Sequence, residues 1–218
     1  DQAAAAVKKF AGLESKLAQA QKTWERSLDK SQTKSKAVQW GPSRGLVAQY
    51  RFDGDLKPQT FVSQDSKPSS PSVQDGEARF VAGRMGQVGS FDGKAYVQDG
   101  DVSGFSSNGY QDDPFTMAAW IYPTAATGSI VSKSQDVTEP TGYGLQLKDG
   151  KVQFNYVDDW VDDGIRIESE KTLDLNQWHH VTLAYDGARY AKGVQLYVDG
   201  EAWKFKVLLD DINNSAPL

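Results

Sequence analysis

The larger part of this chain shows a hydrophobic pattern with a period of two, and that pattern restricts its fold. From Trp40 onward, short runs rich in β-branched and aromatic residues alternate with clusters of Gly, Asp, Asn and Pro. This alternation is typical of an all-β sandwich or barrel built from many short strands. Eight or more strands are expected, and the clearest runs lie at residues 45–52, 77–81, 86–93, 115–123, 128–134, 143–157, 178–187 and 193–200.

One hairpin is predicted from local chemistry alone. Asp149-Gly150 separates GLQLK from KVQFNYV. A two-residue Asp-Gly connection favours a type I′ turn, because both central residues of that turn need a positive φ. Asp92-Gly93, Asp186-Gly187 and Asp199-Gly200 are expected to end strands in a similar way.

The first 36 residues have a different character. They contain no Pro, a single Gly, and many residues that favour helices. Apolar side chains recur at steps of three and four, which places them along one helix face, as in a short coiled-coil seam or a docking stripe: Phe10, Leu13, Leu17, Ala20, Trp24 and Leu28. We therefore expect a helix and a polar linker over residues 1–36, followed by a β domain over residues 40–218.

Composition excludes several classes of partner. The net charge is -5 and the β region has no basic cluster, which argues against nucleic acid. No apolar run approaches the roughly 20 residues that a membrane-spanning helix needs, so membrane insertion is not expected. The chain has no Cys, which excludes disulfides and thiolate chemistry but leaves the compartment open.

The only two histidines, His179 and His180, are adjacent in WHHVTLAYDG. On a strand, neighbouring side chains point to opposite faces, so the two imidazoles cannot reach one metal ion or one substrate atom. We interpret both as structural, hydrogen-bonded strand residues. Five aromatic residues within the strand patterns are expected to pack in the core: Phe91, Phe115, Trp120, Trp178 and Tyr197.

A set of short motifs occurs in a characteristic order at plausible spacing. They are RFDGDL (51–56), FVAGRMGQVGSFDGKAYV (80–97), FTMAAWIYP (115–123), IVSK (130–133), GYGLQL (142–147), QWHHVTLAYDG (177–187) and LYVDG (196–200). In this order they resemble the laminin-G-like branch of the concanavalin A-like lectin/glucanase superfamily, over roughly residues 45–210. The resemblance implies an all-β fold, a two-sheet antiparallel jelly-roll sandwich, here preceded by an N-terminal α-helix.

The resemblance also implies features outside the core of the fold. The helix with AQKTWERSL (20–28) before such a domain resembles the arrangement in large exported planctomycete-type multidomain proteins, so an exported location is expected. The family closes with a strand that resembles IDEVRIY, whereas this chain ends DDINNSAPL (210–218); we therefore expect an excerpt that lacks the final strand. A structural calcium ion is implied at Asp53 and Asp55, although a partner acid near the C-terminus is missing. The alternative is that Asp53-Gly54 forms a turn.

Catalytic motifs are weak. The sandwich glucanases carry a Glu-x-Asp-x-Glu pattern, and Glu168-Ser169-Glu170 is the nearest match, but it lacks the third carboxylate and leads into a turn sequence. GRMGQVG (83–89) suggests a phosphate loop, yet no helix pattern follows it. No GxSxG motif occurs. The sequence therefore favours a domain that is not an enzyme.

A ligand site is predicted in YVDDWVDDGIR (156–166), which reads as a loop between strands. An indole flanked by carboxylates is typical of sugar sites, where a ring stacks and acids hold hydroxyl groups. The predicted ligand residues are Tyr156, Asp158, Asp159, Trp160, Asp162 and Asp163. Two alternatives stay open, a Trp160 folded back on the sandwich edge and a calcium site.

Three functions are compatible with these patterns. The first is a non-catalytic module of a larger exported protein that binds carbohydrate, with calcium as an assisting ion. The second is a structural adaptor that contacts neighbouring protein domains through the helix stripe and an open sandwich edge. The third is a degenerate or substrate-assisted glycosidase, although Glu168 and Glu170 are interpreted as inert.

Overall fold

The computed structural model of the chain describes residues 16, 19–23, 44–62, 68–77, 79–100, 102, 113–134 and 141–213. The chain divides into two units, Asp1–Leu46 and Val47–Leu218. In the first unit, residues 16 and 19–23 are helical, and the Thr23 hydroxyl donates a hydrogen bond of 2.9 Å to the Gln19 carbonyl oxygen. The predicted helix is confirmed at these residues. Of the predicted apolar stripe, only Ala20 is described; its other members and the predicted boundary at residues 36–40 lie outside the described residues.

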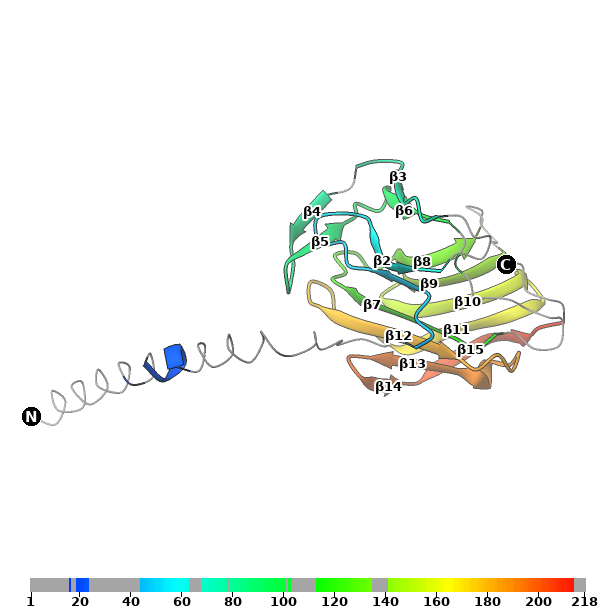
Figure 1. Ribbon diagram of the computed structural model, residues 1–218. Coiled ribbons are helices and arrows are strands. Elements are labelled where there is room, and N and C mark those ends of the chain that lie inside the picture. The colour runs from blue at the N-terminus through cyan, green and yellow to red at the C-terminus, as the bar shows by residue number, and fades with distance from the viewer. Residues whose placement is uncertain are drawn as a thin grey trace, which may run out of the picture. The chain divides into compact units, whose positions relative to one another are not determined.

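The second unit is built from antiparallel strands (Figure 1). Their bounds are β1 (Ala48–Tyr50), β2 (Pro58–Phe61), β3 (Ser72–Gln74), β4 (Arg79–Ala82), β5 (Gln87–Ser90), β6 (Tyr96–Gln98), β7 (Phe115–Ile121), β8 (Gly128–Ser134), β9 (Gly142–Lys148), β10 (Lys151–Asp159), β11 (Asp163–Thr172), β12 (His179–Tyr185), β13 (Val194–Val198), β14 (Glu201–Trp203) and β15 (Phe205–Asp211). A 3-10 turn, η1 (Ala191–Gly193), precedes β13. All eight predicted runs contain strands.

Two large sheets make the sandwich. One has the order β15-β11-β10-β9-β8 and the other the order β14-β13-β12-β7, while β1-β2, β3-β6 and β4-β5 form separate pairs. The facing sides of the large sheets share one hydrophobic core, in which Leu145, Phe154 and Ile167 of the first sheet meet Val181 and Leu183 of the second. The predicted all-β, two-sheet antiparallel architecture is confirmed.

The alternation of buried and half-buried residues along a strand shows which side faces the core. In β12, the odd-numbered residues from His179 to Tyr185 are buried and the even-numbered ones are half-buried. An aromatic group crosses between the sheets, because the ring centroid of Tyr156 in β10 lies 5.7 Å from that of Tyr185 and 6.1 Å from that of Phe115. Side chains of one parity therefore fill the interior, as alternation along a strand requires.

The predicted hairpin at Asp149-Gly150 is confirmed. Lys148 and Lys151 are paired across it, and Asp149 and Gly150 have φ values of 52° and 78°. These positive values are those of a type I′ turn. Asp199-Gly200 makes a second turn of this kind between β13 and β14, with φ values of 53° and 82°.

Two expectations about the core and the strands are wrong. Trp120 and Phe91 were expected in the core, but they are 53% and 45% exposed, while Phe115, Trp178 and Tyr197 are half-buried. Residues 156–166 were expected to form a loop between strands, but residues 163–172 form β11, which lies between β10 and β15 and contains Glu168-Ser169-Glu170. The turn expected after Glu170 is present at residues 175–177. Ile165 and Ile167 of β11 are fully buried, so this strand is a central one.

Nothing in the described residues tests the expectation of a missing final strand, which stays a prediction. None of the helical segments that the structure describes is long and apolar enough to cross a bilayer.

Candidate functional site

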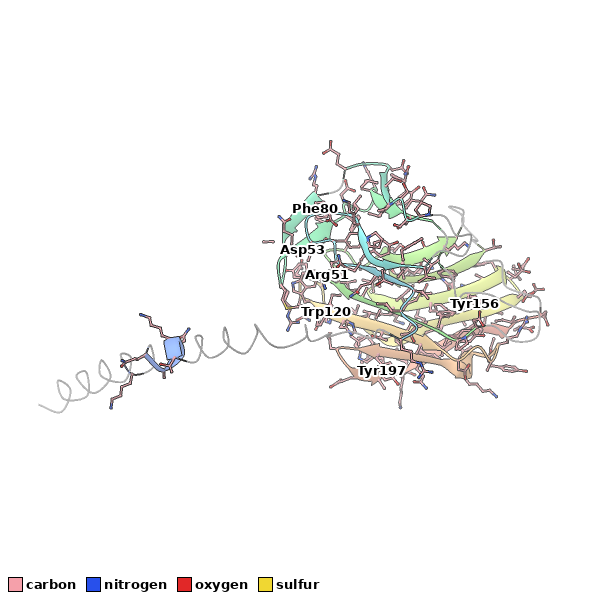
Figure 2. All side chains as sticks on the ribbon, viewed as in Figure 1. Arg51, Asp53, Phe80, Trp120, Tyr156 and Tyr197 are labelled. Carbon is pink, nitrogen blue, oxygen red and sulfur yellow. The ribbon has the colours of Figure 1, made fainter. Side chains whose placement is uncertain are left out.

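A pocket of about 470 Å³ opens on the outer face of the four-stranded sheet. It lies outside the core and is lined by side chains from β7, from the start of β12 and from two hairpin turns. The lining residues are Arg84, Trp120, Trp178, His180, Asp199 and Gly200. Figure 2 shows Trp120 and Asp53 toward the same end of the sandwich, and Tyr156 toward the other end.

Strand register brings the rings of the pocket together. Trp120 of β7 is the direct cross-strand partner of His180 of β12, and both point outward because Ala119 and Val181 lie on the interior face. The ring centroids of Trp120 and His180 lie 5.0 Å apart with an interplanar angle of 47°. Tyr122 and Trp178 form a second aromatic pair with centroids 5.6 Å apart. The sheet therefore presents an aromatic surface to solvent.

Arg84 comes from the tip of the β4-β5 hairpin. Its guanidinium carbon lies 4.9 Å from the centroid of the Trp120 ring, within the range of a cation–π contact. The turn is closed by a hydrogen bond of 2.9 Å from the Gly83 amide to the Gly86 carbonyl, and Gly86 has a φ of 79° that suits glycine. GRMGQVG is therefore a hairpin turn that carries a cation.

Asp199 links the pocket to the buried face of the same strand. One carboxylate oxygen accepts a hydrogen bond of 2.8 Å from the His180 backbone amide, and the other lies 2.8 Å from Nδ1 of His179. Nε2 of His179 faces the Asp174 carbonyl at 3.0 Å. His179 is thus a buried, hydrogen-bonded residue, as predicted. The two imidazoles point to opposite faces, which confirms the prediction from alternation.

The pKa of Asp199 reflects these contacts. Burial raises it, but hydrogen bonds from the His180 amide and from His179 together outweigh the burial, and the pKa lies below its ordinary value. Asp99 behaves similarly in another loop. Its burial is outweighed by hydrogen bonds from Ser69, Tyr50 and the amides of Gly100 and Ser70, so its pKa is also lowered.

These lowered values predict that the fold loses stability in acid. An unfolded Asp has a pKa of about 3.9, and a group whose folded pKa is lower stabilises the fold above that value and loses this contribution as the pH falls through the folded pKa. We expect the unfolding temperature to be constant near pH 6 and to fall as the pH drops below about 5, where the unfolded carboxylates begin to bind protons. Asp99→Asn should be less stable at pH 6 and show a smaller fall, because its side chain does not titrate. An unchanged pH dependence in this variant would contradict the assignment.

The fold places the side chains of the predicted ligand segment, residues 156–166, in different surroundings. The segment forms the end of β10, a tight turn and the start of β11, and the turn is supported by the Val161 amide donating to the Asp159 carboxylate at 2.9 Å. Trp160 is folded back, with the Arg166 guanidinium carbon 3.8 Å from its ring centroid and Nη1 donating to its carbonyl at 3.2 Å. This geometry is the alternative in which the indole packs on the sandwich edge.

The other predicted ligand residues differ in their surroundings. Tyr156 is only 1% exposed and packs in the core, so its side chain offers no surface to a ligand, which corrects the expectation for this residue. Asp163 is also buried, and its carboxylate accepts a hydrogen bond of 2.8 Å from the Asn213 amide. Asp158 is half-buried, whereas Asp159 and Asp162 are exposed. For these exposed residues the ligand role stays a prediction.

The implied calcium ligands have other partners. Asp53 accepts a hydrogen bond of 2.7 Å from the Gln87 amide, and Asp55 accepts one of 3.0 Å from the Lys57 amide. Within the ranges that the structure describes, no three or more His, Asp or Glu side chains gather as metal ligands. Calcium prefers six to eight oxygen ligands, so the surroundings of Asp53 and Asp55 do not fit that ion and fit turn formation instead.

Glu168, one of the two carboxylates noted on β11, has the surroundings of an ion-pair partner. The Glu168 side chain binds the Lys151 ammonium group at 2.7 Å and the Gln153 amide at 2.8 Å. These two hydrogen bonds hold the pKa of Glu168 below its ordinary value. A general acid of a glycosidase needs a raised pKa. The surroundings of Glu168 therefore favour a structural ion pair.

Sequence reasoning missed the pocket, although a signal was present. In FTMAAWI, Phe115 and Met117 have odd numbers and Trp120 has an even number, so these side chains must occupy opposite faces of β7. Applying the same parity test that separated His179 from His180 would have placed Trp120 outside. No sequence signal indicates that Arg84 reaches it, because that contact depends on where a distant hairpin packs.

Comparison with known proteins agrees with the observed architecture. A family model described as the concanavalin A-like lectin/glucanases superfamily, of the laminin G type, matches residues 91–217. No curated protein matches the chain. Five of the six residues that line the pocket lie in the matched region, and Arg84 precedes it. With its two antiparallel sheets and this match over more than half of its length, the chain belongs to the laminin-G-like group of the concanavalin A-like lectin/glucanases superfamily.

Proposed function

We propose that this domain is a non-catalytic module that binds carbohydrate in the pocket around Trp120. Domains of this superfamily are commonly binding modules. The observation that carries the proposal is a half-exposed indole held on a rigid sheet, beside polar groups that can bond to hydroxyls. Sugar sites combine an aromatic face for the apolar side of a ring with a few well-placed polar groups.

The chemistry of the pocket supports binding in preference to turnover. Both oxygens of Asp199, the carboxylate among the described lining residues, already have protein partners, so this group is not positioned to take a proton from a substrate. A module of this kind belongs in an exported protein that meets polysaccharides outside the cell. An exported location is thus part of the proposal.

Binding should depend on the indole of Trp120. We expect Trp120→Ala to weaken binding of an oligosaccharide, first identified on a glycan array, by about fivefold or more, because stacking on one aromatic ring contributes on the order of 1 kcal/mol or more. Isothermal titration calorimetry would measure the change.

A matched control is available for this experiment. Tyr190 is 54% exposed, as Trp120 is 53% exposed, and it lies outside the pocket lining. Tyr190→Ala should leave the affinity unchanged. Equal loss in the two variants, or retained binding in Trp120→Ala, would contradict a sugar site at Trp120.

A second candidate function, protein binding, is favoured by a different observation. Among the described strands, β15 lies at an edge of the five-stranded sheet, and its side chains Val207 and Leu208 are about half exposed. An exposed apolar edge strand can pair with a strand of a partner protein. If no glycan binds while Leu208→Lys disrupts association with a neighbouring domain of the parent protein, this adaptor function replaces the carbohydrate proposal.

A further inference from the structure

The pocket contains a cation that has no anionic partner among the described residues. Arg84 is exposed at the tip of the β4-β5 hairpin, and within the described part of the chain its guanidinium contacts the Trp120 ring and forms no ion pair or hydrogen bond. Asp199 is the one carboxylate among the described lining residues, and its two oxygens contact His179 and His180, not Arg84. The donor groups of Arg84 are therefore available to a ligand.

The charge and shape of this group indicate what it recognises. A guanidinium presents its N–H groups in a planar fork that matches two oxygens of a carboxylate or a sulfate ester. A neutral hydroxyl group uses only part of that fork and none of its charge. We infer that the pocket takes an acidic saccharide, whose anionic oxygens bind Arg84 while a sugar ring lies against Trp120. This inference rests on the proposed function.

The position of Arg84 suits this role because its hairpin and its ring contact orient it. The Gly83 to Gly86 hydrogen bond closes the turn, and the cation–π contact places the guanidinium over the Trp120 ring. Trp120 is still 53% exposed, and the sugar ring is proposed to lie against the part of the indole that Arg84 leaves open. Charge and stacking surface thus lie next to each other. Prior orientation lowers the entropy that binding must otherwise cost.

The rest of the molecule adds no attraction for a polyanion at long range. The chain has a net charge of -5, so a densely charged polymer is repelled by the overall field. Selectivity must then come from direct contact at Arg84. A short saccharide with one or a few acidic groups fits this balance better than a long polyanion.

The test compares three oligosaccharides of equal length against the intact chain: a neutral glucan, an oligouronate and a sulfated glucan with one sulfate per molecule. We expect at least one acidic ligand to bind about fivefold or more tightly than the neutral one, which one charge-assisted bidentate contact can supply. Preference for the uronate would identify a carboxylate as the natural group, and preference for the sulfated glucan would identify a sulfate ester.

Variants of the two hairpin arginines assign the effect. Arg84→Gln should bring the acidic ligand to the affinity of the neutral one, and Arg84→Lys, which keeps the charge without the fork, should give an intermediate value. Arg79→Gln removes the same charge from the start of β4, outside the pocket lining, and should preserve the preference. Thermal unfolding would verify that each variant is folded.

The outcomes separate the two proposals. Equal binding of neutral and acidic ligands to the wild-type chain, or a preference that survives Arg84→Gln, overturns the acidic class but leaves carbohydrate binding standing. Loss of all binding in Trp120→Ala together with loss of only the acidic preference in Arg84→Gln supports both proposals. Absence of binding by every oligosaccharide overturns both.

Discussion

Replacement of Phe154 by Ala is expected to lower the free energy of unfolding by about 3–5 kcal/mol, as large aromatic deletions in cores do. Phe154 is fully buried in β10, and its ring centroid lies 6.1 Å from that of Phe115 and 6.5 Å from that of Tyr156. Its removal would leave a cavity between two sheets that cannot close without moving both. Urea denaturation followed by tryptophan fluorescence would measure the loss.

Phe91→Ala is the matched control for this change. It removes the same atoms from a ring that is 45% exposed and meets Phe52 edge-on at 6.1 Å. We expect a loss of about 1 kcal/mol, because solvent already reaches much of this side chain. Equal losses in the two variants would show that Phe91 belongs to the core after all.

The second large effect is expected from Asp199→Asn. One carboxylate oxygen accepts from the His180 amide, and the other lies 2.8 Å from Nδ1 of His179. Asn keeps an acceptor for the amide but replaces the other oxygen by an NH2 group and removes the negative charge, so the bond to His179 is no longer charge-assisted. Hydrogen bonds to charged groups contribute about 1.5–3 kcal/mol and neutral ones about 1 kcal/mol, so we expect a loss of about 1–2 kcal/mol in the free energy of unfolding.

Asp149→Asn gives a direct comparison, because Asp149 occupies the same position in the other type I′ turn with nearly the same φ. Asn tolerates positive φ well, so both turns keep their backbone. Within the described residues, the Asp149 carboxylate has no hydrogen bond, and its replacement should cost less than about 0.5 kcal/mol. Similar losses in both variants would attribute the effect to the turn and not to the two hydrogen bonds of Asp199.

The pocket combines residues from two parts of the chain, one inside and one outside the region that matches the family. Its floor comes from strands inside the region that matches the family, whereas its cation comes from the β4-β5 hairpin before that region. The common scaffold supplies a flat, rigid face, and a connecting hairpin supplies the group that selects a ligand. Loops can vary without disturbing the core, since few buried contacts depend on them.

Local chemistry explains which parts of the fold could be predicted. The hairpin at Asp149-Gly150 depends on two residues that accept positive φ, and the opposite orientation of His179 and His180 depends only on the geometry of one strand. Strand β11 was missed because its sequence, DGIRIESEKT, is rich in charged residues. Arg166, Glu168 and Glu170 occupy the outer face, and the only large apolar side chains on the buried face are Ile165 and Ile167.

Prediction of the candidate site from local sequence is limited in the same way. Trp160 and its neighbouring acids stand out in the sequence because an indole among carboxylates is unusual, yet the fold turns that indole onto Arg166 and buries Tyr156 and Asp163. Composition can indicate a candidate ligand-binding segment. It cannot indicate which of its side chains a later strand will cover.

By itself, the sequence determined the all-β class, the alternation of buried and exposed residues and the turns, because each of these depends on residues close together in the chain. The tertiary structure decided where the pocket lies. Arg84 and Trp120 are separated by 35 intervening residues, and Trp120 meets His180 only through the pairing of β7 with β12. Their contact is set by the packing of distant elements, which no local pattern encodes.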